Sequence, residues 1–261
     1  MILTLLADSL EEITRKEEYD LEIFSKSDVG LIRKDNQDSS AFSVISSSCV
    51  WAVVCDGMGG AKGGKTASQT AVDYITEYLS TNYYSDINDD DLSALLIEAV
   101  DGANTAIYNK AIDNVDLMGM GTTCELVFVR NSKIHVVHVG DSRTYSIRGG
   151  KILQLTEDHS VVQEMVKRGE ITPEQAQNHP NKNFITRALG VNSTVHIDYI
   201  EVEFQYGDVI LLCSDGLTNC VNNADIVKTV HENRGVSLVD TLVELAKIGG
   251  GTDNITVTVV Y

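Results

Sequence analysis

The chain has 261 residues, of which 43% are apolar, and it contains 20 glycines and 2 prolines. This composition is typical of a globular protein and excludes a collagen-like or low-complexity chain. Acidic residues outnumber basic ones by 38 to 20, so the net charge is −18. Such a charge argues against nucleic acid or an anionic membrane as the main partner, because both need a basic face.

The sequence also bears on where the protein works. No window approaches the roughly 18 continuous apolar residues of a spanning helix. Residues 1–20 begin with a short apolar run but lack the basic start of a signal peptide, and we interpret them as an N-terminal leader without visible chemistry. The five cysteines form no C-x-x-C pair, which fits a reducing compartment. A cytoplasmic protein that does not enter the membrane is predicted.

We take the domain to span residues 21–261, and its first part is predicted to consist of strands followed by helices. Alternating residues predict a strand over 21–28, and apolar runs predict strands over 41–44 and 50–55. Apolar residues at helical spacing then predict two amphipathic helices, over 66–79 and 92–107.

Antiparallel strands are indicated further along. Four strand-like runs occupy 122–129, 133–139, 143–147 and 151–155. The turns between them are short, so neighbouring strands should be antiparallel, and we predict a four-stranded meander. The polar segment 156–190 is predicted to form an insertion over one sheet edge, with short helices at 161–168 and 173–177.

The last part of the chain predicts strands over 195–204, 208–213 and 254–261, and helices over 224–233 and 238–248. Together the elements predict one α+β domain of mostly antiparallel sheets with helices outside them.

Aspartates mark four of the predicted strand ends, as Asp56-Gly57, Asp141-Ser142, Asp215-Gly216 and Asp253-Asn254. One such pair is an ordinary turn signal. Four of them can bring carboxylates to one point, which is electrostatically unfavourable unless cations bind there. The pattern therefore predicts a metal site.

A different class of enzyme is suggested by residues 59–66. Their sequence, GGAKGGKT, matches the Walker A pattern, and it follows a predicted strand and precedes a predicted helix. A P-loop nucleotide hydrolase is thus an alternative. It requires a parallel sheet with helical crossovers, whereas the tight turns within 121–155 predict antiparallel strands.

Six short motifs occur in a consistent order: Arg33 to Asp38 (RKDNQD), Asp56 to Gly60 (DGMGG), Gly121-Thr122-Thr123, Gly140-Asp141-Ser142-Arg143, Ser214-Asp215-Gly216-Leu217 and Asp253-Asn254-Ile255-Thr256. Together they resemble the metal-dependent protein phosphatase family (PPM, type 2C), in its bacterial form, from about residue 21 to the C-terminus. The resemblance implies a four-layer α-β-β-α sandwich of two antiparallel sheets flanked by helices, with two Mn²⁺ or Mg²⁺ ions at one end.

The resemblance also implies a ligand set. Asp56 matches the carboxylate that bridges the two ions, and Gly57 matches the residue whose carbonyl binds one of them. Asp215 and Asp253 match ligands of the other ion, and Asp38 is implied to act through bound waters. Oxygen ligands of this kind favour Mg²⁺ or Mn²⁺ over zinc, since neither His nor Cys recurs at ligand spacing with these aspartates.

Two residues are implied to act on the substrate. Arg33 matches the arginine that binds the phosphate, and its planar fork suits two phosphate oxygens. Asp141, with Asp215, matches a third and weaker ion site of bacterial relatives. Met58 stands where eukaryotic members have a histidine as general acid, so the proton donor stays open, and a water at Asp141 is one candidate. We interpret His138 as an ordinary packing or edge residue.

The implied function is hydrolysis of phosphoserine and phosphothreonine in proteins by a metal-activated water. The implied partners are a serine/threonine kinase and its substrates, and the enzyme is expected to be a monomer. The alternative within the family is a catalytically silent binding module. The presence of the metal-site aspartates and of Arg33 favours an active enzyme.

Overall fold

The computed structural model describes residues 20–261, so all but the last residue of the expected leader lies outside the described residues. The strands of the described residues form two sheets, and neighbouring strands in both are antiparallel. The first sheet has the order β2 (Asp38–Ser46), β3 (Cys49–Met58), β5 (Cys124–Arg130), β6 (Lys133–Val139) and β9 (Asp198–Glu203), with β4 (Gly121–Thr122) beside β3. The second has the order β1 (Ile23–Asp28), β11 (Ile255–Val260), β10 (Val209–Cys213), β7 (Arg143–Arg148) and β8 (Lys151–Gln154).

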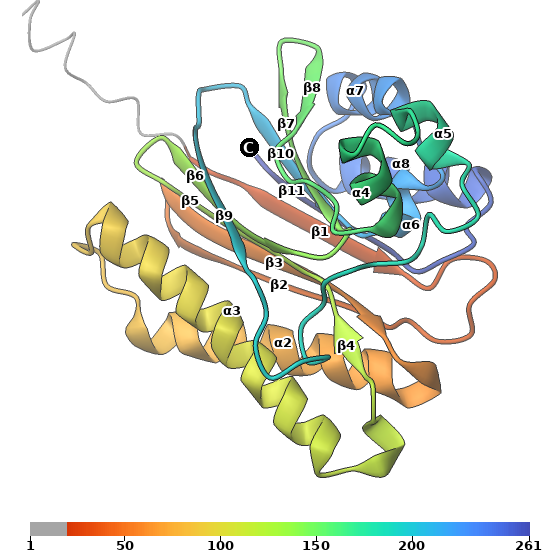
Figure 1. Ribbon diagram of the computed structural model, residues 1–261. Coiled ribbons are helices and arrows are strands. Elements are labelled where there is room, and N and C mark those ends of the chain that lie inside the picture. The colour runs from red at the N-terminus through yellow and green to blue at the C-terminus, as the bar shows by residue number, and fades with distance from the viewer. Residues whose placement is uncertain (1–19) are drawn as a thin grey trace, which may run out of the picture.

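Helices cover the outer face of each sheet (Figure 1). The long helices α2 (Gly60–Asn82) and α3 (Asp89–Ile112) lie on the first sheet, and α7 (Asn223–Glu232) and α8 (Gly235–Ile248) lie on the second. The shorter elements are η1 (Val115–Leu117), α4 (Val161–Lys167), α5 (Pro173–Gln177) and α6 (Asp215–Thr218). This is the predicted four-layer sandwich, which is confirmed. Within the described residues, no helix combines the length and apolar character that a membrane span needs.

Three apolar clusters hold the layers together. One joins α2 and α3 to the first sheet, one joins α7 and α8 to the second, and one lies between the sheets. The strands between two layers are apolar on both faces, as the buried run at 50–54 of β3 illustrates. Because apolar side chains fill this interior, polar side chains at the strand ends are left to define the site.

The predicted meander is wrong in one respect. β5 and β6 form a hairpin in the first sheet, whereas β7 and β8 form a hairpin in the second. The chain therefore crosses between the sheets at 140–142. Gly140 makes this possible, since its φ is +117° and a Cβ there would lie 2.6 Å from the Cβ of Thr123. Strand patterns specify which faces are buried but not which sheet a strand joins.

The antiparallel sheets also exclude the P-loop alternative. Residues 59–66 form the start of α2, and α2 leads from β3 to α3 rather than to a parallel strand. Lys65 donates through Nζ to the backbone carbonyl of Asp38 at 2.8 Å and to Oγ of Ser39 at 3.1 Å. Its ammonium group is thus bound to the neighbouring strand β2.

The polar segment between β8 and β9 carries α4 and α5 and returns past α3. Asn104 of α3, which is fully buried, holds this return. Its Oδ1 accepts from the Gly190 amide at 2.8 Å, and its Nδ2 donates to the carbonyls of Asn192 and Ser193 at 3.2 and 3.3 Å. One side chain thereby satisfies three backbone groups of an irregular segment.

Replacing Asn104 with Ala should lower the free energy of unfolding by about 2 to 4 kcal/mol, because buried backbone groups lose their partners. Urea denaturation followed by circular dichroism measures this. Thr105→Ala, at the next and exposed position of the same helix, is the control and should change little. Equal effects of the two substitutions would contradict the role given to Asn104.

Candidate metal centre

An open cleft of about 410 Å³ lies at the end of the sandwich where β3 and β10 end and β11 begins. It is lined by six of the residues singled out in the sequence: Arg33, Asp56, Gly57, Asp141, Asp215 and Asp253. The seventh, Asp38 of β2, lies directly opposite Asp56 of the neighbouring strand β3 and is 2% exposed. The fold therefore brings all the predicted site residues to one place.

Two threonines fix the backbone at Asp56. The Asp56 amide donates to Oγ1 of Thr123 at 2.9 Å, and its carbonyl accepts from Oγ1 of Thr122 at 2.8 Å and from the Thr123 amide at 2.9 Å. With both backbone groups held by β4 and its continuation, the Asp56 side chain lies at the wall of the cleft. The Gly-Thr-Thr motif thus holds the backbone of Asp56 and leaves its carboxylate to the cleft.

Gly57 has no room for a side chain. A Cβ there would lie 2.1 Å from the carbonyl oxygen of Gly64 and 2.6 Å from that of Gln37. Both contacts are with backbone atoms, which cannot yield as a flexible side chain would. Glycine lets β3 pack against α2 while its own backbone borders the cleft.

Two buried carboxylate oxygens have no partner within the described part of the chain. Oδ2 of Asp38 accepts from Oγ of Ser214 at 2.8 Å and from Oγ1 of Thr256 at 2.7 Å, whereas Oδ1 accepts nothing. Oδ2 of Asp215 accepts from Nδ2 of Asn219 at 2.9 Å, and its Oδ1 again accepts nothing. Buried carboxylate oxygens of this kind need a proton, a water or a cation.

The carboxylates also repel one another. Burial, followed by the charges of Asp141 and Asp253, raises the pKa of Asp215 to about 8. Burial and the neighbouring aspartates hold the pKa of Asp56 well above its usual range. The pKa of Asp38 rises to about 6, mainly through burial. Each raised pKa means that the negative charge of the carboxylate is unfavourable in the cleft, and a bound cation compensates this charge without protonation.

The donor set fits a hard divalent cation. Carboxylate and carbonyl oxygens converge on the cleft, and these are the ligands of Mg²⁺ and Mn²⁺. Nowhere between residues 20 and 261 do three or more His, Cys, Asp or Glu side chains form a group able to hold an ion by themselves. An ion in this cleft would therefore keep several waters, as Mg²⁺ commonly does.

Asn254 positions the loop that carries Arg33. Its Nδ2 donates to the carbonyls of Val29 and Asp35, each at 3.0 Å, and its Oδ1 accepts from the Gln37 amide at 2.8 Å. Arg33 itself is half exposed and donates through Nη2 to Oδ2 of Asp253 at 2.7 Å. The guanidinium group therefore lies at the edge of the carboxylate cluster.

Several supporting residues escaped the sequence analysis. Asn219 contacts Asp215, and nothing in its sequence surroundings marks it as a site residue. Lys65 contacts the backbone of Asp38, whereas its sequence surroundings suggested a nucleotide site instead. His138 is not an edge residue, because β6 lies between β5 and β9 and the side chain is fully buried. Its partner is Glu125 on β5. The roles of these residues arise from contacts between separate strands and helices, which the local sequence pattern does not show.

The raised pKa values predict a pH dependence for the metal-free protein. The folded state binds more protons than the unfolded state between about pH 4 and the raised values near 6 and 8. Stability should therefore fall as the pH rises through this range. Melting temperatures measured in a chelator should decrease from about pH 5.5 to about pH 8.5, and Asp215→Asn should flatten the decrease.

Addition of Mn²⁺ should reverse this trend, because the ion binds the deprotonated carboxylates. A metal-free protein whose melting temperature is the same in wild type and Asp215→Asn at every pH would contradict the strong mutual repulsion.

Comparison with known proteins agrees with the geometry of the cleft. The chain matches the family model described as protein phosphatase 2C over residues 33–246. It is 37% identical over 236 residues to the serine/threonine phosphatase stp of Listeria innocua, which covers 90% of this chain and 93% of that one.

Solved structures are similar over nearly the same span. The serine/threonine phosphatase Stp1 from Staphylococcus aureus has a TM-score of 0.86 at 32% identity, covering 94% of this chain and 97% of that one. The catalytic domain of the phosphatase PstP, solved with two manganese ions, has a TM-score of 0.80 at 35% identity, covering 92% and 97%. The chain is therefore similar in its whole layered fold to known phosphatases, one of which was solved with bound manganese.

Proposed function

The chain belongs to the protein phosphatase 2C family, and from this premise we propose how its cleft hydrolyses phosphoserine and phosphothreonine esters of proteins. The observation that carries the proposal is the convergence of Asp38, Asp56, Asp215 and Asp253, with two buried oxygens left without partners. The family match and the relatives, which are serine/threonine phosphatases, favour the active enzyme over a catalytically silent member. The chain is a protein serine/threonine phosphatase.

The cofactor is Mn²⁺ or Mg²⁺, as in the family. When bound, two such ions lower the pKa of water from about 15.7 toward neutrality and stabilise negative charge on the phosphoryl group. Asp56 would serve both ions and the Gly57 carbonyl one of them. Asp215 and Asp253 would hold the other, and Asp38 would contribute through water.

Arg33 binds the substrate phosphate in this proposal. Its guanidinium group reaches the cleft, is half exposed and already faces a carboxylate, Asp253. Its planar fork can donate to two phosphate oxygens at once and so orient the ester. The three hydrogen bonds of Asn254 limit the movement of the loop from which Arg33 projects.

We assign Asp141 a part in delivering a proton to the leaving oxygen of the ester. Met58 lines the cleft but has no acidic proton to donate, so the leaving alkoxide needs a donor from elsewhere. Asp141 lines the same cleft and, with Asp215, would form a third and weaker ion site. A water that Asp141 orients would deliver the proton.

The segment 156–190 contributes a wall of the cleft through Asn183 and Ile185. We assign this segment a part in selecting among phosphorylated proteins. The proposed partners are a serine/threonine kinase and its substrates, and the proposed enzyme is a cytoplasmic monomer. Its catalytic domain would span residues 21–261, after a leader of residues 1–20.

Asp56→Ala and Asp215→Ala should each remove activity, because each removes a proposed metal ligand. Hydrolysis of a phosphothreonine peptide should fall below about a tenth of the wild-type kcat, a barrier increase of at least about 1.4 kcal/mol. Calorimetric titration should show weakened Mn²⁺ binding while circular dichroism shows a folded protein. Asp101→Ala, an exposed aspartate on α3, is the control and should keep full activity. Retained activity in either cleft variant would refute the assignment.

Asp141→Ala should distinguish proton delivery from ion binding. We expect the variant to keep two tightly bound Mn²⁺ ions and to lose kcat on a phosphopeptide. The loss should be smaller on an aryl phosphate whose leaving group needs no proton. Equal losses on both substrates would refute the role in proton delivery.

A further inference from the structure

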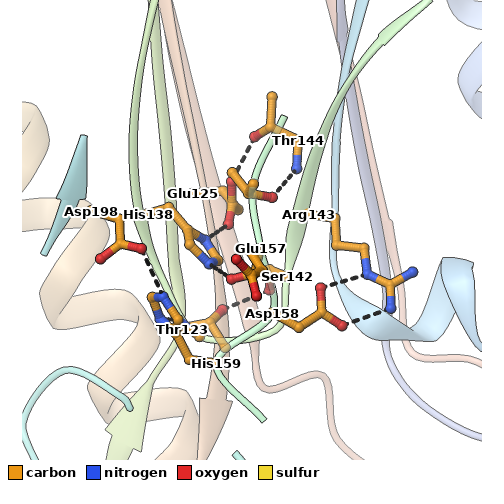
Figure 2. A network of polar contacts seen from close by, with 12 residues as sticks. Thr123, Glu125, His138, Ser142, Arg143, Thr144, Glu157, Asp158, His159 and Asp198 are labelled. Atoms are coloured by element: carbon orange, nitrogen blue, oxygen red, sulfur yellow. Dashed lines mark hydrogen bonds and ion pairs between the residues drawn. The ribbon is translucent and has the colours of Figure 1, made fainter. Parts of the chain in front are cut away.

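A buried polar network surrounds the crossover between the two sheets (Figure 2). At its centre, Glu125 of β5 and His138 of β6 lie directly opposite one another, and both side chains are fully buried. Val127 and Val136, two residues away on the same strands, belong to the apolar cluster between the sheets. Side chains two residues apart share a face, so the pair occupies the inter-sheet interior near the cleft.

Every polar atom of this pair has a partner. Nδ1 of His138 contacts Oε1 of Glu125, and Nε2 donates to the carbonyl of Glu157 at 2.9 Å. Oε2 of Glu125 accepts from Oγ1 of Thr144 at 2.6 Å. Both ring nitrogens therefore face acceptors, which favours a doubly protonated ring beside a carboxylate. Burial raises the pKa of Glu125 and opposes its charged form, whereas His138 and Thr144 favour the carboxylate. Burial lowers the pKa of His138, but Glu125 outweighs it and leaves the His138 pKa raised.

The contacts of the pair join the elements before and after the crossover. Glu125 and His138 belong to the strands before it, Thr144 belongs to the strand after it, and Glu157 belongs to the segment leading to α4. Glu125 in the first sheet thus binds Thr144 in the second. The short peptide 140–142 lies between these fixed points.

Neighbouring contacts hold the residues on either side of Asp141. The Gly140 amide donates to Nδ1 of His159 at 3.0 Å, and its carbonyl accepts from the His159 amide at 2.7 Å. Oγ of Ser142 lies 2.7 Å from Oγ1 of Thr123, the residue that also holds the Asp56 amide. Asp141 is the member of the crossover that lines the cleft.

We propose that Glu125 and His138 are positioning residues for Asp141: their buried ion pair fixes the crossover between the sheets and with it the place at which the Asp141 carboxylate enters the cleft. This inference rests on the proposed role of Asp141. A buried ion pair seldom adds net stability over apolar side chains of similar size. Its role here is the position of the crossover, since an apolar pair could fill the interior but could not bind Thr144 and Glu157.

The test compares two variants with a matched control. Glu125→Gln removes the charge and keeps the size, and the double variant Glu125→Met with His138→Leu replaces the pair with apolar side chains. The control is His135→Gln. His135 is a second fully buried histidine of β6, three residues earlier and on the opposite face, where its Nδ1 lies 2.7 Å from Tyr199 Oη.

Hydrogen exchange of the metal-free full chain reports how firmly the backbone of the crossover is held. Both variants should exchange faster than wild type in the peptide that spans 140–142, and the control should not. In activity assays on a phosphopeptide, both should need about tenfold more Mn²⁺ for half-maximal rate, the usual effect of losing a residue that supports a ligand. Calorimetry should still detect two tightly bound Mn²⁺ ions.

A folded double variant with wild-type exchange at 140–142 and wild-type Mn²⁺ dependence would overturn the proposal. So would an equal effect of the His135→Gln control. If Asp141→Ala itself left the rate and the Mn²⁺ dependence unchanged, the role given to Asp141 would fail, and the exchange measurement would still decide whether the pair positions the crossover.

Discussion

Desolvation and mutual repulsion of the carboxylates clustered at the cleft are the constraint on which the active end of this protein depends. Asp56 and Asp215 have strongly raised pKa values because burial and neighbouring aspartates both penalise their charged forms. The apolar clusters of the sandwich stabilise the fold against this unfavourable free energy at the cleft, and bound cations remove it. Folding and metal binding are therefore linked in the same set of side chains.

The polar residues around the cleft follow from that constraint. Carboxylates that repel one another would move apart unless the backbone that carries them is fixed. Thr122 and Thr123 fix Asp56, and Ser214 and Thr256 fix Asp38, all through hydrogen bonds of their side-chain hydroxyl groups. These side chains bear no charge, so they hold the aspartates without cancelling the negative potential that attracts a cation.

The sequence specified the fold class and the residues of the cleft more fully than it specified their support. Asp56 and Asp215 could be found because each ends an apolar strand, and the strand pattern places such ends at the same edge. The crossover at Gly140 could not be found, because hairpin turns say nothing about which sheet receives the next strand. The pairing of Glu125 with His138 was likewise missed, since it forms only when β5 and β6 lie side by side. The further contact of Glu125 with Thr144 joins the first sheet to the second, which the chain reaches only later.

The positions at which metal ions bind in this chain test the assigned site most directly. A crystal structure of the protein grown with Mn²⁺, with anomalous diffraction recorded at the manganese edge, would locate them. We expect two ions in the cleft, both within coordinating distance of Asp56, with Asp215 and Asp253 on one of them and water completing each shell. Anomalous density away from Asp56, or a cleft without density in a crystal of the active enzyme, would contradict the account.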